Sequence, residues 1–300
     1  MFKGKIKTWL RAIRPFSFTG SVIPVTLGAI LSIKQNRFQF NYFILSVIAI
    51  VFLQAAINLL SDHDDYENKV DTKDSYGSSG VILENLLSSK QVRKGGIICL
   101  IIGSLIGLFL SYEKGILILI LGLIGALGGY SYTGKPLMLK YRGLGDPLIF
   151  LLFGPLMVIG SYYVQMQNIS AIAFYVSIPL GLLTTAIAHA NDIRDILHDE
   201  KAGIKTLSIL VGKNNSKKIY YGMLLISYVS IIIMSFYKVL PSWSLICLIT
   251  LPTAYKNAKV LYISDNLNSG LVTLDQSTAK LQAEFGIILI FSILLSYLLR

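Results

Sequence analysis

Charged residues are scarce in this chain of 300 residues: only 14% are Asp, Glu, Lys or Arg, whereas 54% are apolar and the mean hydropathy is +0.64. A soluble chain of this size does not carry successive apolar runs of about 20 residues, each long enough to cross a bilayer. Such runs recur along the whole sequence. The sequence therefore predicts a protein that crosses a membrane several times.

Cysteine and histidine are also rare. The two cysteines, Cys99 and Cys247, both lie inside apolar runs, so we expect neither a disulfide nor a metal site from them. The three histidines, His63, His189 and His198, match no compact ligand spacing of zinc or iron sites. A metal centre built on thiolates or imidazoles is therefore disfavoured.

The N-terminal segment 1–14 is basic and amphipathic, with apolar residues at helical spacing. We expect it to lie on the membrane surface with Trp9 at the headgroup level, and not to be a cleavable signal peptide. The net charge of +11 is compatible with nucleic-acid binding, but its distribution along the chain indicates membrane topology instead. No nucleic-acid partner is expected.

Nine predicted spans divide the chain, with no separable soluble domain, so that residues 1–300 form one membrane domain. The N-terminus and the loops after spans two, four, six and eight hold 22 of the 27 Lys and Arg residues and 15 of the 16 acids, Glu113 being the exception. By the positive-inside rule this side is cytoplasmic, in a cell membrane. The spans are expected at about 16–35, 42–60, 96–112, 115–133, 146–164, 170–190, 219–237, 241–257 and 284–299.

Two acidic clusters follow spans two and six, which end on the same side of the membrane. In the first, Asn58, Asp62 and Asp65 are spaced i, i+4, i+7 and share one face of a continuing helix. The second cluster includes Asn191. Its three acids Asp192, Asp195 and Asp199 are spaced i, i+3, i+7 and again share one helix face. The equal sidedness makes a shared site geometrically possible.

Both clusters predict a site for a hard cation. Acids at a helix C-terminus oppose the macrodipole and repel each other, so a bound cation is expected to offset that cost. Oxygen ligands without cysteine favour Mg²⁺ held by a few carboxylates together with substrate phosphates. A carboxylate-lined ion pathway of a transporter is the alternative, although transporter acids usually lie near the bilayer midplane.

Basic residues share the loops with these acids. Lys140 and Arg142 follow span four, and Arg194 and Lys205 flank the second cluster. Each by itself is typical of a positive-inside anchor. Beside two metal-binding faces, they would complete a diphosphate site in which Mg²⁺ bridges oxygens and Lys and Arg neutralise the remaining charge.

Four ordered motifs resemble the UbiA superfamily of intramembrane prenyltransferases, and more narrowly the 1,4-dihydroxy-2-naphthoate polyprenyltransferases of menaquinone synthesis. The likeness covers nearly the whole chain. The motifs are Arg14-Pro15 with 21–28, Asn58 to Thr72, the segments 132–136, 141–146 and 153–155, and 191–195 followed by Asp199, Gly203, 205–207 and Gly212.

The resemblance implies an all-α ring of about nine transmembrane helices around a central cavity that opens sideways to lipid. It implies Mg²⁺-dependent transfer of a polyprenyl chain from its diphosphate to an aromatic acceptor: dihydroxynaphthoate or, as the alternative, 4-hydroxybenzoate or another quinone or lipid precursor. Asp62, Asp65, Asp195 and Asp199 would bind the metal. The substrate-binding residues would be Asn58, Asp71, Lys140, Arg142, Asn191, Asp192, Arg194 and Lys205.

Overall fold

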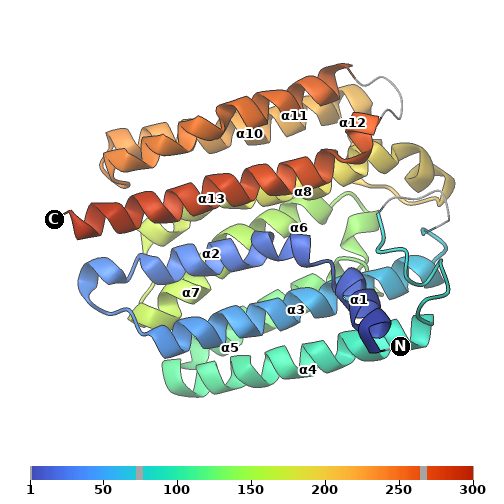
Figure 1. Cartoon of the computed structure of the whole chain (residues 1–300), viewed down its shortest axis with the longest axis horizontal. Coiled ribbons are helices and arrows are strands. Elements are labelled where there is room, and N and C mark those ends of the chain that lie inside the picture. The colour runs from blue at the N-terminus through green and yellow to red at the C-terminus, as the bar shows by residue number, and fades with distance from the viewer. Residues whose placement is uncertain (1, 72–76, 264–268, 300) are drawn as a thin grey trace.

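The computed structural model describes residues 2–71, 77–263 and 269–299, and its long helices run side by side along one direction (Figure 1). Apart from one isolated bridge between Arg142 and Lys205, the described residues contain no β-structure. The prediction of an all-α fold is confirmed. Thr72, at the end of the first acidic motif, and Arg300 lie outside the described residues.

The helices have the following bounds. They are α1 (Phe2–Ile13), η1 (Pro15–Phe18), α2 (Thr19–Ile30), η2 (Ile33–Gln35), α3 (Phe40–Glu67), α4 (Ser89–Lys114), α5 (Ile116–Ser131), η3 (Leu139–Tyr141), α6 (Gly145–Leu151), η4 (Leu152–Leu156), α7 (Met157–Met166), α8 (Ala171–Lys201), α9 (Leu207–Val211), α10 (Lys213–Phe236), η5 (Ser242–Thr250), α11 (Leu251–Ile263), α12 (Ser269–Val272) and α13 (Leu274–Leu298).

Seven helical stretches of the described chain are long and apolar enough to cross a membrane. Two further segments correspond to the remaining predicted spans: α5, which is shorter, and the continuous pair η5–α11. The prediction of about nine spans therefore agrees with the fold. The protein is a multi-pass membrane protein, and its termini lie at opposite ends of the helix bundle (Figure 1).

The helices that carry the acidic clusters extend well past the predicted spans. We expected span two to end near residue 60 and span six near residue 190, whereas α3 continues to Glu67 and α8 to Lys201. Hydropathy identifies only the apolar part of a helix, so it does not detect a polar extension of the same helix. Both extensions emerge at the same end of the bundle (Figure 1), so the predicted sidedness of the clusters is confirmed.

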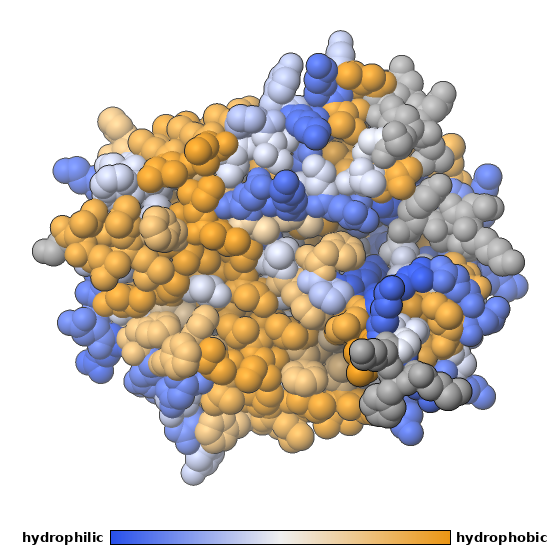
Figure 2. Space-filling view, in the orientation of Figure 1, coloured by the Kyte–Doolittle hydropathy of each residue, from blue (hydrophilic) through white to orange (hydrophobic). Residues whose placement is uncertain are grey.

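The largest apolar core lies between α2, α7, α8, α10 and α13, where Leu27, Leu180 and Phe285 are fully buried. The outer surface is also apolar, because α4 and α10 expose rows of Ile, Leu and Phe side chains. Figure 2 shows a broad hydrophobic region on one face, with hydrophilic residues in a band across its upper middle and at the margins. An apolar exterior of this extent is suited to lipid contact.

Helix α1 lies against the bundle at the end where the acidic clusters emerge (Figure 1). Trp9 packs on Gly95 of α4, where an added Cβ would meet its ring at 2.6 Å. On the outside, Arg11 forms a bidentate ion pair with Glu84, with N–O distances of 2.7 and 2.5 Å. Ile6 and Leu10 remain about half exposed, at 52% and 50%, which suits a helix that rests on a membrane surface.

Candidate functional site

The ends of α3 and α8 enclose a polar cavity of about 190 Å³ together with η1 and the loop after α5. Seven of the twelve predicted site residues line it: Asn58, Asp65, Lys140, Asn191, Asp192, Asp195 and Asp199. The structure thus brings residues from both acidic clusters to one place. Asp62, Asp71, Arg142, Arg194 and Lys205 do not line this cavity.

Asp65 lines the cavity from α3, and two residues of the segment after α5 contact its carboxylate. Its carboxylate accepts a hydrogen bond from the hydroxyl of Tyr141 and lies 3.3 Å from the Nζ of Lys140. Burial by itself lowers the pKa of Lys140, but nearby carboxylates, that of Asp65 first, outweigh it and raise the pKa well above its usual value. Lys140 is therefore a permanent cation in the cavity wall.

Asp62 is directed elsewhere, although it lies on the same helix face as Asp65. Its carboxylate pairs with the guanidinium of Arg14 and accepts hydrogen bonds from the backbone N–H and hydroxyl of Ser79. Arg14 also donates to the carbonyl of Gly77 at 2.9 Å and itself lines the cavity. Asp62 therefore joins the end of α1 to the loop after α3.

Asn58 also positions the chain around Arg14. Its amide nitrogen donates to the carbonyl of Ile13 at 2.8 Å and to the hydroxyl of Ser17 at 2.9 Å. Both amide protons are therefore committed to the turn that connects α1 with η1. This turn needs such support, because Arg14 has a φ of 50° in the left-handed region, which is uncommon for a residue other than glycine.

On α8, Asp195 is paired with its neighbour. Arg194 forms two hydrogen bonds to the Asp195 carboxylate, at 2.9 and 2.8 Å, and a further ion pair with Asp275 of α13 at 3.2 Å. Arg194 thus orients Asp195 from behind and is not itself in the cavity wall. By contrast, the oxygen of Asn191 is buried and has no hydrogen-bond partner among the described residues.

The remaining predicted residues lie around the rim. Arg142 donates a hydrogen bond to the carbonyl of Pro136 at 3.1 Å. The side chain of Lys205 is exposed, and its backbone N–H donates to the carbonyl of Tyr141 at 3.1 Å. Asp71 borders a small hollow beside Asp62. Burial, with the nearby Asp65 carboxylate, raises the pKa of Asp71 to about 6.

Among the cavity residues that received no role in the sequence analysis are Arg14, Tyr132 and Gly77. Arg14 and Tyr132 belong to the quoted motifs, but a basic residue after an amphipathic helix and an aromatic residue at a span end are ordinary features of membrane proteins. The phenol of Tyr132 is neutral at physiological pH, because the ordinary pKa of tyrosine is about 10. Gly77 borders the cavity beside Asp195: a Cβ added at Gly77 would lie 3.4 Å from a carboxylate oxygen of Asp195.

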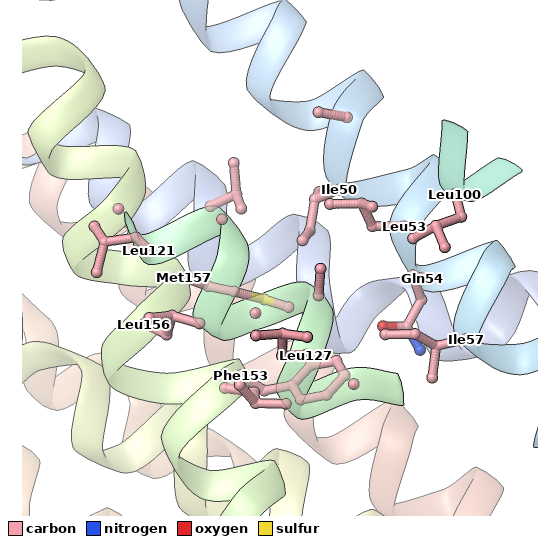
Figure 3. A pocket seen from close by; sticks show the side chains of 18 of the residues that line it. Ile50, Leu53, Gln54, Ile57, Leu100, Leu121, Leu127, Phe153, Leu156 and Met157 are labelled. Carbon is pink, nitrogen blue, oxygen red and sulfur yellow. The ribbon is translucent and has the colours of Figure 1, made fainter. Parts of the chain in front are cut away.

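An apolar cavity of about 380 Å³ adjoins the polar one between α3, α5, η4 and α7. Leu53, Ile57, Leu121, Phe153 and Met157 point into it (Figure 3). The two cavities share six lining residues: Gln54, Ile57, Ser61, Gly129, Leu152 and Phe153. The charged cavity and the apolar cavity are therefore adjacent, with a common stretch of wall.

The glycine run of α5 serves both packing and the apolar cavity. An added Cβ at Gly129 would meet Ile57 at 2.3 Å, and one at Gly128 would meet Leu152 at 3.0 Å, so these two glycines permit close helix packing. Gly122, however, lines the cavity and has nothing within 4 Å of an added Cβ. Small residues here leave space as well as permit helix contact.

The sequence pattern of the UbiA prenyltransferase family matches residues 21–274. The chain belongs to this family. This UbiA-family prenyltransferase is 26% identical to 1,4-dihydroxy-2-naphthoate octaprenyltransferase of Bacillus subtilis (strain 168), over 95% of this chain and 91% of that protein. It is 31% identical to UbiA prenyltransferase domain-containing protein 1 of Mus musculus, over 98% of this chain and 86% of that protein.

Solved structures share the fold of this prenyltransferase. A UbiA homolog from Archaeoglobus fulgidus bound to GPP and Mg²⁺ superposes with a TM-score of 0.66 at 15% identity, covering 95% of this chain and 99% of that one. Digeranylgeranylglyceryl phosphate synthase superposes with a TM-score of 0.65 at 19% identity, over 99% and 100% of the two chains. A transporter function, the alternative of another class, is not supported.

Proposed function

We propose that this enzyme transfers a polyprenyl chain from its diphosphate to 1,4-dihydroxy-2-naphthoate in menaquinone synthesis, with Mg²⁺ as cofactor. The observation that carries the proposal is that the charged cavity and the apolar cavity are adjacent and share a stretch of wall. A prenyl diphosphate has the same two parts, an anionic head and a hydrophobic tail. The relation to the Bacillus subtilis naphthoate octaprenyltransferase supports the acceptor.

The donor set of the charged cavity fits Mg²⁺. Asp65 on α3 and Asp192, Asp195 and Asp199 on α8 supply carboxylate oxygens, which are the ligands that hard cations prefer. The described residues contain no compact group of three acidic, histidine or cysteine side chains around one point. In this proposal Mg²⁺ is bound by few protein ligands, and phosphate oxygens complete its coordination. When bound, Mg²⁺ would neutralise charge on the diphosphate and make it a better leaving group.

The residues of the chain have separate tasks in this scheme. Lys140 and Arg14 place two fixed positive charges at the head group, and Arg194 holds the Asp195 carboxylate in orientation. Asp62 and Asn58 act as positioning residues, because their polar atoms already bind the α1–η1 turn and the Ser79 loop. The ring of Tyr132 forms a neutral aromatic wall beside the reacting centre, where a ring face can stabilise a cation.

The bond changes follow from this placement. The allylic C–O bond breaks and its electron pair leaves with diphosphate. A ring carbon of the acceptor then forms the new C–C bond to the allylic cation. With dihydroxynaphthoate, attack at the carboxylated carbon is followed by loss of CO₂, whose electron pair restores the aromatic ring. Lys140 lies where it can attract the acceptor carboxylate.

A competition assay tests the acceptor. Membranes containing the enzyme receive Mg²⁺, a long-chain prenyl diphosphate and equal concentrations of dihydroxynaphthoate and 4-hydroxybenzoate, and mass spectrometry identifies the products. We expect prenylated naphthoquinol with CO₂ released in step. Exclusive formation of prenylated 4-hydroxybenzoate, with its carboxylate retained, would contradict the acceptor but not the reaction class.

We also propose a cell-membrane location with the N-terminus and the charged cavity in the cytoplasm, on the basis of the 22-to-5 distribution of basic residues. A reporter fused after Arg300 should be active only if it works outside the cytoplasm, because nine crossings separate the termini. Cytoplasmic activity of that fusion would contradict this orientation.

A further inference from the structure

A third cavity, of about 500 Å³, lies at the opposite end of the bundle from the catalytic residues. The ends of α2, α7, α10 and α13 and the starts of α8 and η5 surround it. This is the end that holds the C-terminus in Figure 1. The proposed prenyl transfer uses none of these residues, so the cavity requires a separate explanation.

The charge of this cavity is positive. Lys34 and Lys238 both line it, although that side of the membrane holds only five of the 27 basic residues. No acidic residue occurs among the described residues of its wall. The single acid predicted on that side, Glu113, lies elsewhere and accepts a hydrogen bond from Tyr42 at 2.8 Å. Neither lysine forms an ion pair within the described part of the chain.

Two helix N-termini also lie at this cavity, among the C-terminal ends of the four other helices. Helix α8 starts at the cavity with Ser170 as its N-cap, and η5 starts there after Pro241. The N-terminal end of a helix carries a partial positive charge that favours anions. Lys34 and Lys238 each follow a helix C-terminus, where a cation is favourable in any case. The helix C-termini account for each lysine separately. They do not explain why both lysines line one cavity that has no carboxylate among its described residues.

The remaining wall is amphipathic and lies at the ends of the predicted spans. Trp243, which is 47% exposed, and Tyr297 line the cavity together with apolar side chains such as Leu31 and Ile293. Trp and Tyr concentrate at the level of lipid headgroups. A ligand that matches these walls has an anionic head and an acyl body, and it approaches from the membrane.

We propose that this cavity binds the headgroup of an anionic phospholipid from the leaflet opposite the catalytic site. Lys34 and Lys238 would contact the phosphate, and Trp243 and the apolar wall would contact the upper acyl chains. The volume lies within the range of small-molecule sites. This inference is independent of the acceptor and of the prenyl-transfer mechanism.

Native mass spectrometry of the detergent-purified enzyme tests it, with phosphatidylglycerol and phosphatidylcholine of identical acyl chains as probes. The wild type should retain phosphatidylglycerol in preference to phosphatidylcholine, and 100-fold excess inorganic phosphate should not displace it. The double variant Lys34→Gln/Lys238→Gln should lose that preference by about tenfold or more, because each cation near a lipid surface contributes to anion attraction. Lys34→Arg/Lys238→Arg should keep it.

Arg37→Gln is the matched control, since Arg37 lies on the same side but does not line the cavity. It removes one charge and should leave the preference unchanged. Normal prenyl transfer by the double variant will establish that it is folded. Equal retention of both lipids by the wild type, or an unchanged preference in the double variant, would overturn the proposal. Displacement by inorganic phosphate would instead identify a free-anion site and also overturn it.

Discussion

Arg14 and Asp62 form an ion pair that joins the end of α1 to the polar extension of α3. The pair lies beside the charged cavity, and Arg14 reaches it with a left-handed backbone conformation. Asp62 is 2% exposed and is also bound by Ser79. The first acid of the α3 cluster thus fixes the cavity wall, whereas Asp65, one turn later, faces the cavity.

We therefore expect Asp62 and Arg14 to act as a unit. Asp62→Asn and Arg14→Gln should each lower kcat/KM strongly, and the double variant should lose far less than the product of the two losses. Residues in direct contact typically couple by about 1 kcal/mol or more. A double-mutant cycle on prenyl transfer measures the coupling, and strictly multiplicative losses would show that the pair has no joint role.

The acids that line the cavity should behave differently. Asp65→Asn, Asp195→Asn and Asp199→Asn should each reduce turnover by roughly a thousandfold, because they remove ligands that act on the leaving group in the transition state. Glu200→Gln is the control, since Glu200 is exposed at the end of α8 and does not line the cavity. Near-normal turnover in both an α3 and an α8 variant would disprove a shared site.

Removal of Mg²⁺ should abolish donor binding as well as turnover. Four carboxylates line the cavity with two fixed cations, Lys140 and Arg14, so that a diphosphate meets net negative charge there unless a metal ion is present. Equilibrium binding of a prenyl diphosphate, measured after EDTA treatment and again after Mg²⁺ is restored, checks this. Equally tight binding in EDTA would count against metal-bridged recognition.

The open space at Gly122 allows a test of the apolar cavity. Gly122→Leu should fill space that the prenyl tail occupies, and it should raise KM for a long-chain donor by about tenfold while leaving a dimethylallyl donor unaffected. Gly107→Leu on α4 is the matched control, because Gly107 also has nothing within 4 Å of an added Cβ but lines neither cavity. Equal effects on both donors would place the tail elsewhere.

A buried polar chain behind the site should determine stability. His189 is fully buried, with its Nδ1 at 2.6 Å from Asp146 of α6 and its Nε2 at 3.0 Å from the carbonyl of Ser216 in α10. His189→Ala leaves the Asp146 carboxylate buried without that partner, which should cost about 3 kcal/mol or more. Thermal unfolding in detergent measures this, with Asp146→Leu/His189→Leu expected to be less destabilised. An unchanged melting temperature in His189→Ala would contradict it.

The sequence by itself predicted the membrane class of the protein, about nine spans and the emergence of both acidic clusters at one end of the bundle. These follow from hydropathy, helical spacing and charge asymmetry, all of which are local properties of the chain. Because α3 and α8 are helical through their polar ends, the spacing of Asp192, Asp195 and Asp199 was enough to place them on one face. Lys140, which the sequence analysis assigned to a diphosphate site, likewise lines the cavity.

Only the tertiary structure decided which neighbours each charge has. Asp62 and Asp65 lie on one helix face, so sequence periodicity cannot distinguish their roles. Their partners differ because of tertiary packing: Asp62 contacts Arg14 and Ser79. Asp65 contacts Tyr141 and Lys140. Arg194 likewise pairs with Asp275, 81 positions along the chain. The charged cavity also arises where α3 meets α8 and η1, and the apolar one where α3 meets α5 and α7; such contacts between distant segments leave no local signal in the sequence.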